Sequence, residues 1–150
     1  MVTKKISKKE KTAKVFVYLG GNRLMTLGTV WNNKPWAATV FFAFDTTLQI
    51  FFYSREDTRH CQHITQNPHV SVVINQNWKE KGGFIKGLQM TGRAARVSSK
   101  EYKRVYALYK SRFGWADDFS ADHRLYSIKP KEVWYIDQKF FGHFSRVKVL

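Results

Sequence analysis

The sequence predicts a mainly β fold, an antiparallel barrel that is closed or half-closed and has flanking helices. Many short β-type segments follow one another, separated by turn residues. Aromatic residues make up 16% of the chain, a share that suits strands. We expect the 150 residues to form one domain. Within it, residues 1–21 would form a basic N-terminal helix, and residues 22–150 would form the barrel with two further helices.

The first element is predicted from a capping pattern. Ser7 and Glu10 have the spacing of a capping box, in which each side chain binds the other residue's backbone N–H. A helix from about Lys8 to Leu19 is expected to follow, and the glycine pair at 20–21 ends it.

Three strands are expected next, joined as an antiparallel meander. The central one is nearly continuous in apolar residues, so we expect it to be buried on both faces. An Asn-Asn pair and an Asp-Thr-Thr segment supply the turns. The strands cover Thr26–Trp31, Trp36–Phe44 and Leu48–Tyr53, with turns at 32–33 and 45–47.

The second half of the chain alternates helices with further strands. A short helix is expected over Thr58–Gln66, ending before Asn67-Pro68. A longer helix begins after Ser98 and Glu101, which repeat the capping pattern, and its apolar stripe runs from Tyr102 to Phe113. The remaining strands are expected at 70–75, 84–97, 125–128, 133–136 and 143–149, with loops over 77–83 and 115–122.

The net charge of +15 favours anionic partners: phosphate ligands, nucleic acid or an acidic membrane surface. Cys61 is the only cysteine and cannot form an intramolecular disulfide. The lysine-rich N-terminal segment of the chain lacks the apolar h-region of a secretory signal. No stretch approaches the ~20 apolar residues of a membrane span. We therefore expect a cytoplasmic protein with no membrane partner. The histidine spacings predict no metal site.

The segment from residue 54 to residue 60 lies where a strand leads into a helix. Helix N-termini present free N–H groups and a positive dipole end, which suit a phosphate. Ser54 and Thr58 add hydroxyl donors, and Arg55 and Arg59 add charged, forked donors. Ordinary helix capping, with the arginines in solvent, explains these residues equally well, so both interpretations stay open.

Two other segments are compatible with a planar ligand. Gln89 lies in a strand between apolar residues, and its amide could bind the edge of a heterocycle. Ala37 and Ala38 could leave the backbone open to a flat ring. For Gln89, the alternative is a side chain that faces solvent. For the two alanines, the alternative is ordinary packing within a strand.

The order of these segments resembles the pyridoxamine-phosphate-oxidase-like FMN-binding split-barrel superfamily. The resemblance covers about Leu24 to Val149. It rests on Met25–Val30, Trp36–Val40, Phe51–Ser54 and Asn67–Val70. The small bacterial YhbP-type branch is resembled more closely through Thr58–His60, Ile85–Gln89 and Arg112-Phe113.

This resemblance implies a six-stranded split barrel that forms a homodimer and binds FMN in clefts at the dimer interface. The phosphate would be held by Ser54, Arg55, Thr58, Arg59 and His60. The isoalloxazine ring would be flanked by Ala37, Ala38 and Thr39, with Phe52 and Tyr53 near it and Gln89 at the place of a flavin-contacting glutamine. The C-terminal part, around Trp134 and residues 140–143, would reach the site.

The sequence departs from the superfamily at two places. His60 stands where many members have lysine. The ending Gly142–Arg146 does not reproduce the Arg- and His-bearing substrate motif of the oxidases that act on pyridoxine phosphate. The second departure argues against vitamin B6 oxidation.

The leading hypothesis is an FMN-binding protein that acts as a flavin-dependent oxidoreductase on a small molecule, with no catalytic side chain assigned. A basic β-barrel that binds RNA or DNA through aromatic and lysine side chains is the alternative. A barrel that has lost its cofactor is a third possibility.

Overall fold

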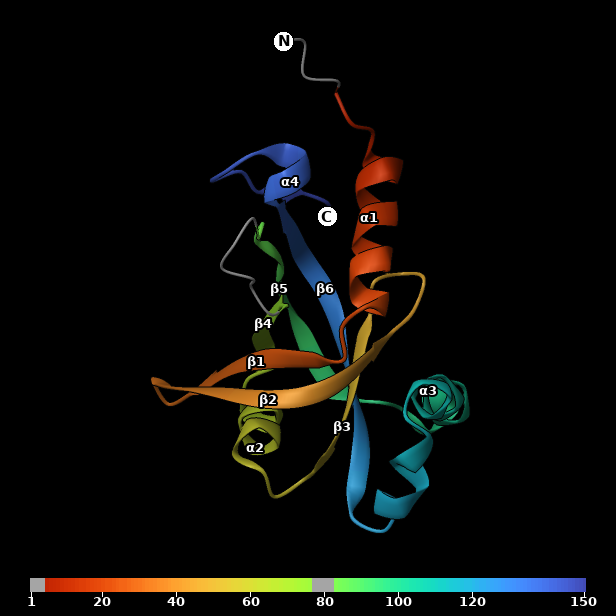
Figure 1. Cartoon of the computed structure of the whole chain (residues 1–150). Helices are drawn as coiled ribbons and strands as arrows, with labels where there is room; N and C mark the ends of the chain where they lie inside the picture. Colours follow the sequence, from red (N-terminus) through yellow and green to blue (C-terminus); the bar gives the residue numbers. More distant parts are fainter. Residues whose placement is uncertain (1–4, 77–82) are drawn as a thin grey trace.

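The computed structural model describes residues 5–76 and 83–150, and its strands form an antiparallel β-barrel (Figure 1). The sheet order is β3-β2-β1-β4-β5-β6, and pairing of β3 with β6 closes it, which confirms the predicted six-stranded barrel. A short β7 extends the sheet beside β6. The strands are β1 Leu24–Trp31, β2 Lys34–Phe44, β3 Ile50–Arg55, β4 His69–Asn75, β5 Lys86–Arg96, β6 His123–Asp137 and β7 Val147–Lys148.

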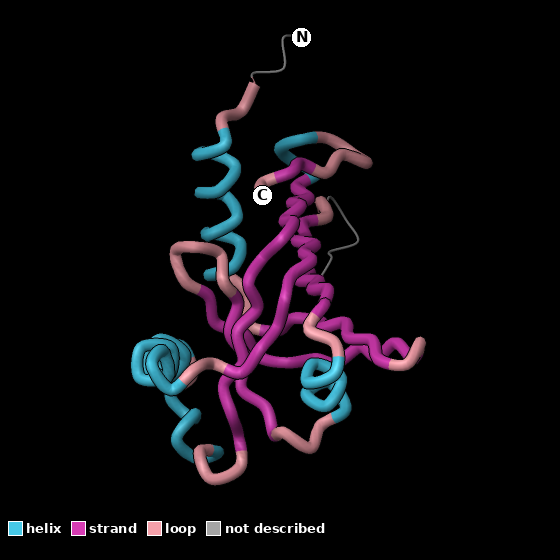
Figure 2. Tube along the Cα trace, turned by 180° about the vertical axis from the view of Figure 1, so that it is seen from behind, coloured by secondary structure: helices cyan, strands magenta, loops and turns pink. Residues whose placement is uncertain are grey.

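In the described ranges, four α-helices and a 3₁₀ helix flank the barrel (Figure 2). They are α1 Lys8–Gly20, α2 Arg59–Gln66, α3 Ser99–Arg112, η1 Gly114–Phe119 and α4 Gln138–Phe141. The predicted capping box of α1 is confirmed: Ser7 Oγ accepts from the Glu10 N–H at 3.2 Å, and the Glu10 carboxylate accepts from the Ser7 N–H at 2.8 Å. No helix in the described ranges is long and apolar enough to cross a membrane.

Strands β1 and β2 form a hairpin that projects from the barrel (Figure 1). Asn32 and Asn33 form its turn with φ values of 51° and 56°, a conformation that asparagine tolerates well. The expectation that β2 is buried on both faces is wrong for its first half. Residues 34–37 are exposed because they belong to the projecting arm, and only near the end of the strand, at Phe42 and Ala43, are both faces buried.

Strand β6 runs without interruption through Pro130, where two separate pieces were expected. A β-bulge absorbs the proline: Thr91 of β5 pairs with Glu132 and Gly92 pairs with Pro130, so Lys131 is an extra residue on β6. A Cβ on Gly92 would lie 2.4 Å from the Lys129 carbonyl oxygen, so this close approach requires glycine.

Two smaller expectations also need correction. The segment 115–122 was expected to be a loop, but much of it is the 3₁₀ helix η1. The final strand, expected over 143–149, is reduced to the two residues of β7. Helix α4 forms before it, with Asp137 Oδ1 accepting from the Phe140 N–H at 3.1 Å as its N-cap. The expected loop over 77–83 lies outside the described residues except for Gly83.

The core has two parts, one inside the barrel and one outside it. The inner core includes Leu27, Phe42 and Phe52, and it is joined by Leu19 of α1 and Ile64 of α2. The outer core lies between α3 and the outer surface of β2, β3 and β6 and contains Phe51, Tyr53, Val105, Tyr109 and Leu125. Among the described residues, the outer core includes no side chain of β1, β4 or β5, the strands in the middle of the outer surface.

Candidate functional site

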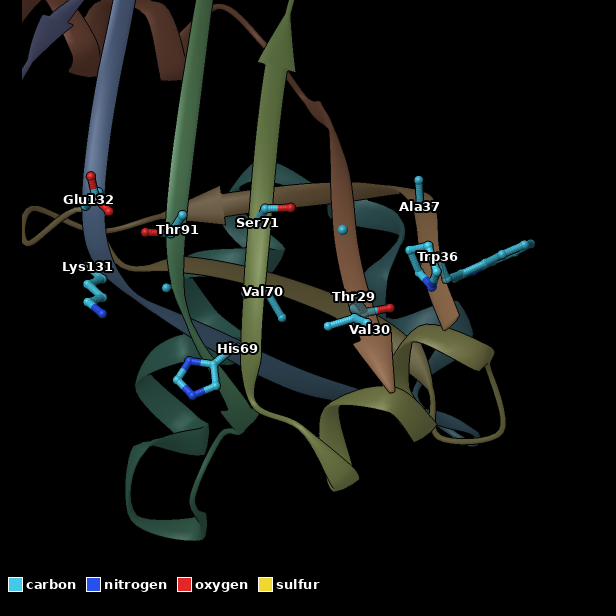
Figure 3. Close-up of a pocket in the computed structure, with 13 residues that line it drawn as sticks. Thr29, Val30, Trp36, Ala37, His69, Val70, Ser71, Thr91, Lys131 and Glu132 are labelled. Carbon is cyan, nitrogen blue, oxygen red and sulfur yellow. The ribbon is translucent and has the colours of Figure 1, made fainter. Parts of the chain in front are cut away.

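A groove of about 930 Å³, called here the outer groove, lies on this part of the sheet (Figure 3). Strand register places one row of side chains across five strands at this point. Ala37 of β2 pairs with Gly28 of β1, which pairs with Ser71 of β4; Ser71 pairs with Thr91 of β5, which pairs with Glu132 of β6. Partners in register point to the same face of a sheet, so this row forms the floor of the groove.

The floor is flat at its centre because its side chains are small. A Cβ on Gly28 would lie only 2.3 Å from Ser71 Oγ, so the serine hydroxyl already fills the space above the glycine. The hydroxyls of Ser71 and Thr91 are the hydrogen-bonding groups of the central floor. The surface that results is flat and carries two hydroxyl groups.

The two ends of the groove differ in chemistry. At the hairpin end, the Trp36 ring lines the groove and the Arg59 guanidinium lies 4.2 Å from its centroid. Arg59 itself lines an adjoining cavity of about 660 Å³. Toward the β6 end, Lys131 and Glu132 of β6 line the groove, together with His69 at the start of β4.

Three of the residues predicted to hold phosphate form a hydrogen-bonded group with one another instead of facing the groove. His60 Nε2 lies 3.0 Å from Ser54 Oγ and 3.3 Å from Thr58 Oγ1. Thr58 is the N-cap of α2 and accepts from the Cys61 N–H. Ser54 and His60 are both buried, and this burial, together with the nearby His63, lowers the pKa of His60.

The two predicted arginines have different surroundings. Arg55 is paired with Asp57, with Nη2 2.5 Å from Oδ2 and Nε 3.0 Å from Oδ1. Asp122 lies 3.9 Å from the same guanidinium. Arg59 makes no ion pair within the described ranges and lies against Trp36. Of the two, Arg59 is the one available to an anion.

The predicted ring-flanking residues fall on opposite faces of the sheet. Ala37 and Thr39 face outward, whereas Ala38 packs against the inner core. Phe52 points into the barrel, where its ring stacks on Tyr126 at 5.1 Å, and Tyr53 packs under α3. Phe52 and Tyr53 therefore lie in the two cores and not along the groove.

Gln89 lies on the outer surface, as its position between the buried Leu88 and Met90 predicts. It lines an adjoining pocket of about 240 Å³ that shares Ser71 and Thr91 with the outer groove. Its Oε1 accepts a hydrogen bond from Arg146 Nη1 at 3.0 Å. The amide nitrogen of Gln89 has no hydrogen bond among the described residues.

Sequence reasoning missed several groove residues, namely Gly28, His69, Ser71, Thr91 and Lys131. Each is an ordinary strand residue, and only the pairing between distant strands brings them together. The local signals available were Gly28 in β1 and Ser71 in β4, two small residues whose neighbours along the strand are larger.

Comparison with known proteins agrees with this fold. The family model described as pyridoxamine 5'-phosphate oxidase matches residues 12–137. The UPF0306 protein of Photorhabdus laumondii is 30% identical over 97 residues, which is 64% of this chain and 67% of that protein.

Solved structures share the fold at low identity. The heme storage protein HutZ of Vibrio cholerae has a TM-score of 0.75 at 20% identity, covering 87% of this chain and 97% of that one. An FAD-binding protein of Mesorhizobium loti has a TM-score of 0.67 at 17% identity, covering 81% and 88%. The family match spans most of the chain and confirms the resemblance seen in the sequence: this protein belongs to the pyridoxamine 5'-phosphate oxidase family.

Proposed function

We propose that this chain forms a homodimer that binds FMN in the outer groove and serves as a flavin-dependent oxidoreductase for a small molecule. The observation that carries the proposal is the flat floor of Ala37, Gly28 and Ser71 in the outer groove. A planar isoalloxazine ring needs a flat surface of this kind, and bulky side chains would prevent its approach.

The residues around the floor fit the polar parts of the cofactor. The hydroxyls of Ser71 and Thr91 and the amide of Gln89 can bind the ring edge, which has both donors and acceptors. Arg59, at the first turn of α2 and without a carboxylate partner in the described ranges, fits the phosphate. The segment 54–60 thus contributes its second arginine to the proposed site.

A second copy of the chain would close the groove. Exposed apolar side chains border it, among them Val30, Trp36 and Val73, with 37%, 40% and 39% of their surface accessible. Apolar surface around an open groove favours association, because burying it removes it from water. The homodimer expected from the sequence therefore has a surface suited to it.

Bound FMN would supply the electron or hydride transfer, while the protein orients the flavin and the substrate and controls the access of water. The chain's residues act by binding: the floor orients the ring, and the polar groups hold its edge and phosphate.

The test is a titration of the purified protein with FMN, followed by flavin fluorescence and by light scattering. We expect saturable binding by a dimer, and loss of binding in Ala37→Phe, which fills the groove. Ala107→Phe, on the exposed side of α3, is the matched control. A monomer, or FMN binding that Ala37→Phe leaves unchanged, would contradict the proposal.

Heme is the competing ligand, because one structural neighbour is a heme storage protein and His69 lines the groove. A parallel titration with hemin separates the two. A Soret shift that depends on His69, without FMN binding, would replace the flavin proposal with a heme one.

A further inference from the structure

The β-bulge in β6 turns Lys131 toward the outer groove. In a regular strand, successive side chains point to opposite faces, so Lys131 and Glu132 would be separated by the sheet. Because Lys131 is the extra residue of the bulge, both side chains line the groove. Gly92 permits this arrangement, since any Cβ there would meet the Lys129 carbonyl oxygen at 2.4 Å.

Two more basic groups belong to this part of the sheet. His69 lines the groove, and its cross-strand partner Arg93 places Nη1 3.5 Å from His69 Nε2. We call the group formed by His69, Arg93 and Lys131 the basic end of the groove (Figure 3 labels the first and the last).

In the part of the chain that the structure describes, no carboxylate neutralises either cation of the basic end. Within residues 5–76 and 83–150, Lys131 and Arg93 form no ion pair with a carboxylate. The acid at this end of the groove is Glu132, whose Oε2 accepts a hydrogen bond from Trp134 Nε1 at 3.3 Å. Two unpaired cations and an imidazole at the edge of a groove attract an anion and can hold it through charge-assisted hydrogen bonds.

This end lies far from the place proposed for the flavin phosphate. Arg59 and Trp36 are at the β2 side of the groove, whereas Lys131 is on β6, and Figure 3 shows Trp36 and Lys131 on opposite sides. Four strand spacings separate β2 from β6, about 19 Å along the sheet. FMN has a single phosphate, so one held near Arg59 leaves the basic end free for another anion.

We propose that the basic end binds a carboxylate or phosphate group of the substrate and so selects anionic small molecules. This inference rests on the proposed function, because the substrate must meet the flavin within the same groove. The chemistry is shared by carboxylates and phosphates, and it is the bulge, with Gly92 opposite it, that places the ammonium where such a group would lie.

The experiment titrates the FMN-loaded protein with inorganic phosphate and, separately, with benzoate, following changes in the flavin absorbance spectrum. Lys131→Gln and Arg93→Gln test the basic end, and Lys103→Gln, exposed on α3, is the matched control. We expect the anion dissociation constant to rise about tenfold in Lys131→Gln, as for loss of one charged hydrogen bond. The affinity for FMN should be unchanged. The probe with the lower dissociation constant, phosphate or benzoate, identifies the class of anion.

Three results would be decisive. Equal anion binding by wild type, Lys131→Gln and Lys103→Gln would overturn the inference. Weaker binding of FMN but not of riboflavin in Lys131→Gln would also overturn it, because the basic end would then hold the flavin phosphate. If no flavin binds, calorimetry of the flavin-free protein with the same anions still tests the site. Anion binding that depends on Lys131 would then support the basic end, while the missing flavin counts against the proposed function.

Discussion

The Ser71 hydroxyl lies in the space that a side chain on Gly28 would need, since a Cβ on residue 28 would be 2.3 Å from Ser71 Oγ. The two residues are register partners on β1 and β4. The contact therefore fixes two properties at once: the close packing of this strand pair and the flatness of the groove floor.

Gly28→Ala should destabilise the protein and weaken flavin binding. The added methyl group forces Ser71 or one of the two strands to move, and overpacking of this kind costs about 1–3 kcal/mol. Urea unfolding measures the stability, and an FMN titration measures the binding.

Ser71→Ala is the matched partner for this experiment because it removes the hydroxyl that clashes. The double variant Gly28→Ala/Ser71→Ala should be more stable than the sum of the two single changes predicts. Strict additivity would show that the two side chains do not share this space.

Arg59→Ala should weaken FMN binding while leaving riboflavin binding nearly unchanged. Riboflavin lacks the phosphate, and a hydrogen bond to a charged group contributes about 1.5–3 kcal/mol. Arg55→Ala is the matched control, because Arg55 is already paired with Asp57. The sequence suggested equal roles for the two arginines, whereas the structure predicts a larger effect at Arg59.

Two outcomes would contradict this assignment. An equal loss for FMN and riboflavin in Arg59→Ala would mean that the residue supports the structure through Trp36. A larger effect of Arg55→Ala would place the phosphate on the other side of the α2 N-terminus.

The elements predictable from sequence depend on neighbouring residues. The Ser7–Glu10 capping box and the Asn32-Asn33 turn are both present where the sequence places them. These features need only short-range geometry, so a single sequence contains the information.

The groove was not predictable for the opposite reason. Gly28 meets Ser71 only through the pairing of β1 with β4, strands that are not consecutive in the chain. Pro130 predicted a break, yet the bulge opposite Gly92 lets β6 continue and redirects Lys131. The His60 ring is hydrogen-bonded to Ser54, a contact that the sequence did not reveal, and the phosphate role of His60 stays a prediction.

Gln89→Leu should weaken FMN binding by about 0.5–1.5 kcal/mol, the range of a neutral hydrogen bond, with fold and dimer intact. The amide lies beside Ser71 and Thr91, and leucine keeps its bulk while removing its polar atoms. The flavin reduction potential should shift as well, because the proposed contact of the amide is with the ring edge.

Arg146→Ala separates the two possible roles of this glutamine. Gln89 Oε1 accepts from Arg146, so Gln89→Leu also releases the C-terminal segment. If Arg146→Ala reproduces the full effect, Gln89 acts by positioning that segment. If it does not, the amide acts on the flavin directly.

His60 should make the protein less stable in mild acid. Burial, with the nearby His63, lowers the pKa of His60 in the folded state, so the unfolded chain binds a proton more readily. The stabilisation is complete above the unfolded pKa of about 6.5 and is lost as the pH falls from there through the folded pKa.

His60→Gln removes this titration while its amide can still bond to Ser54 and Thr58. Between pH 7.5 and pH 5.5, the free energy of unfolding should therefore fall more in the wild type than in His60→Gln. His143→Gln, at an exposed position, should keep the wild-type slope. If wild type and His60→Gln lose stability in parallel, the acid sensitivity arises elsewhere and the buried imidazole of His60 is tolerated in its charged form.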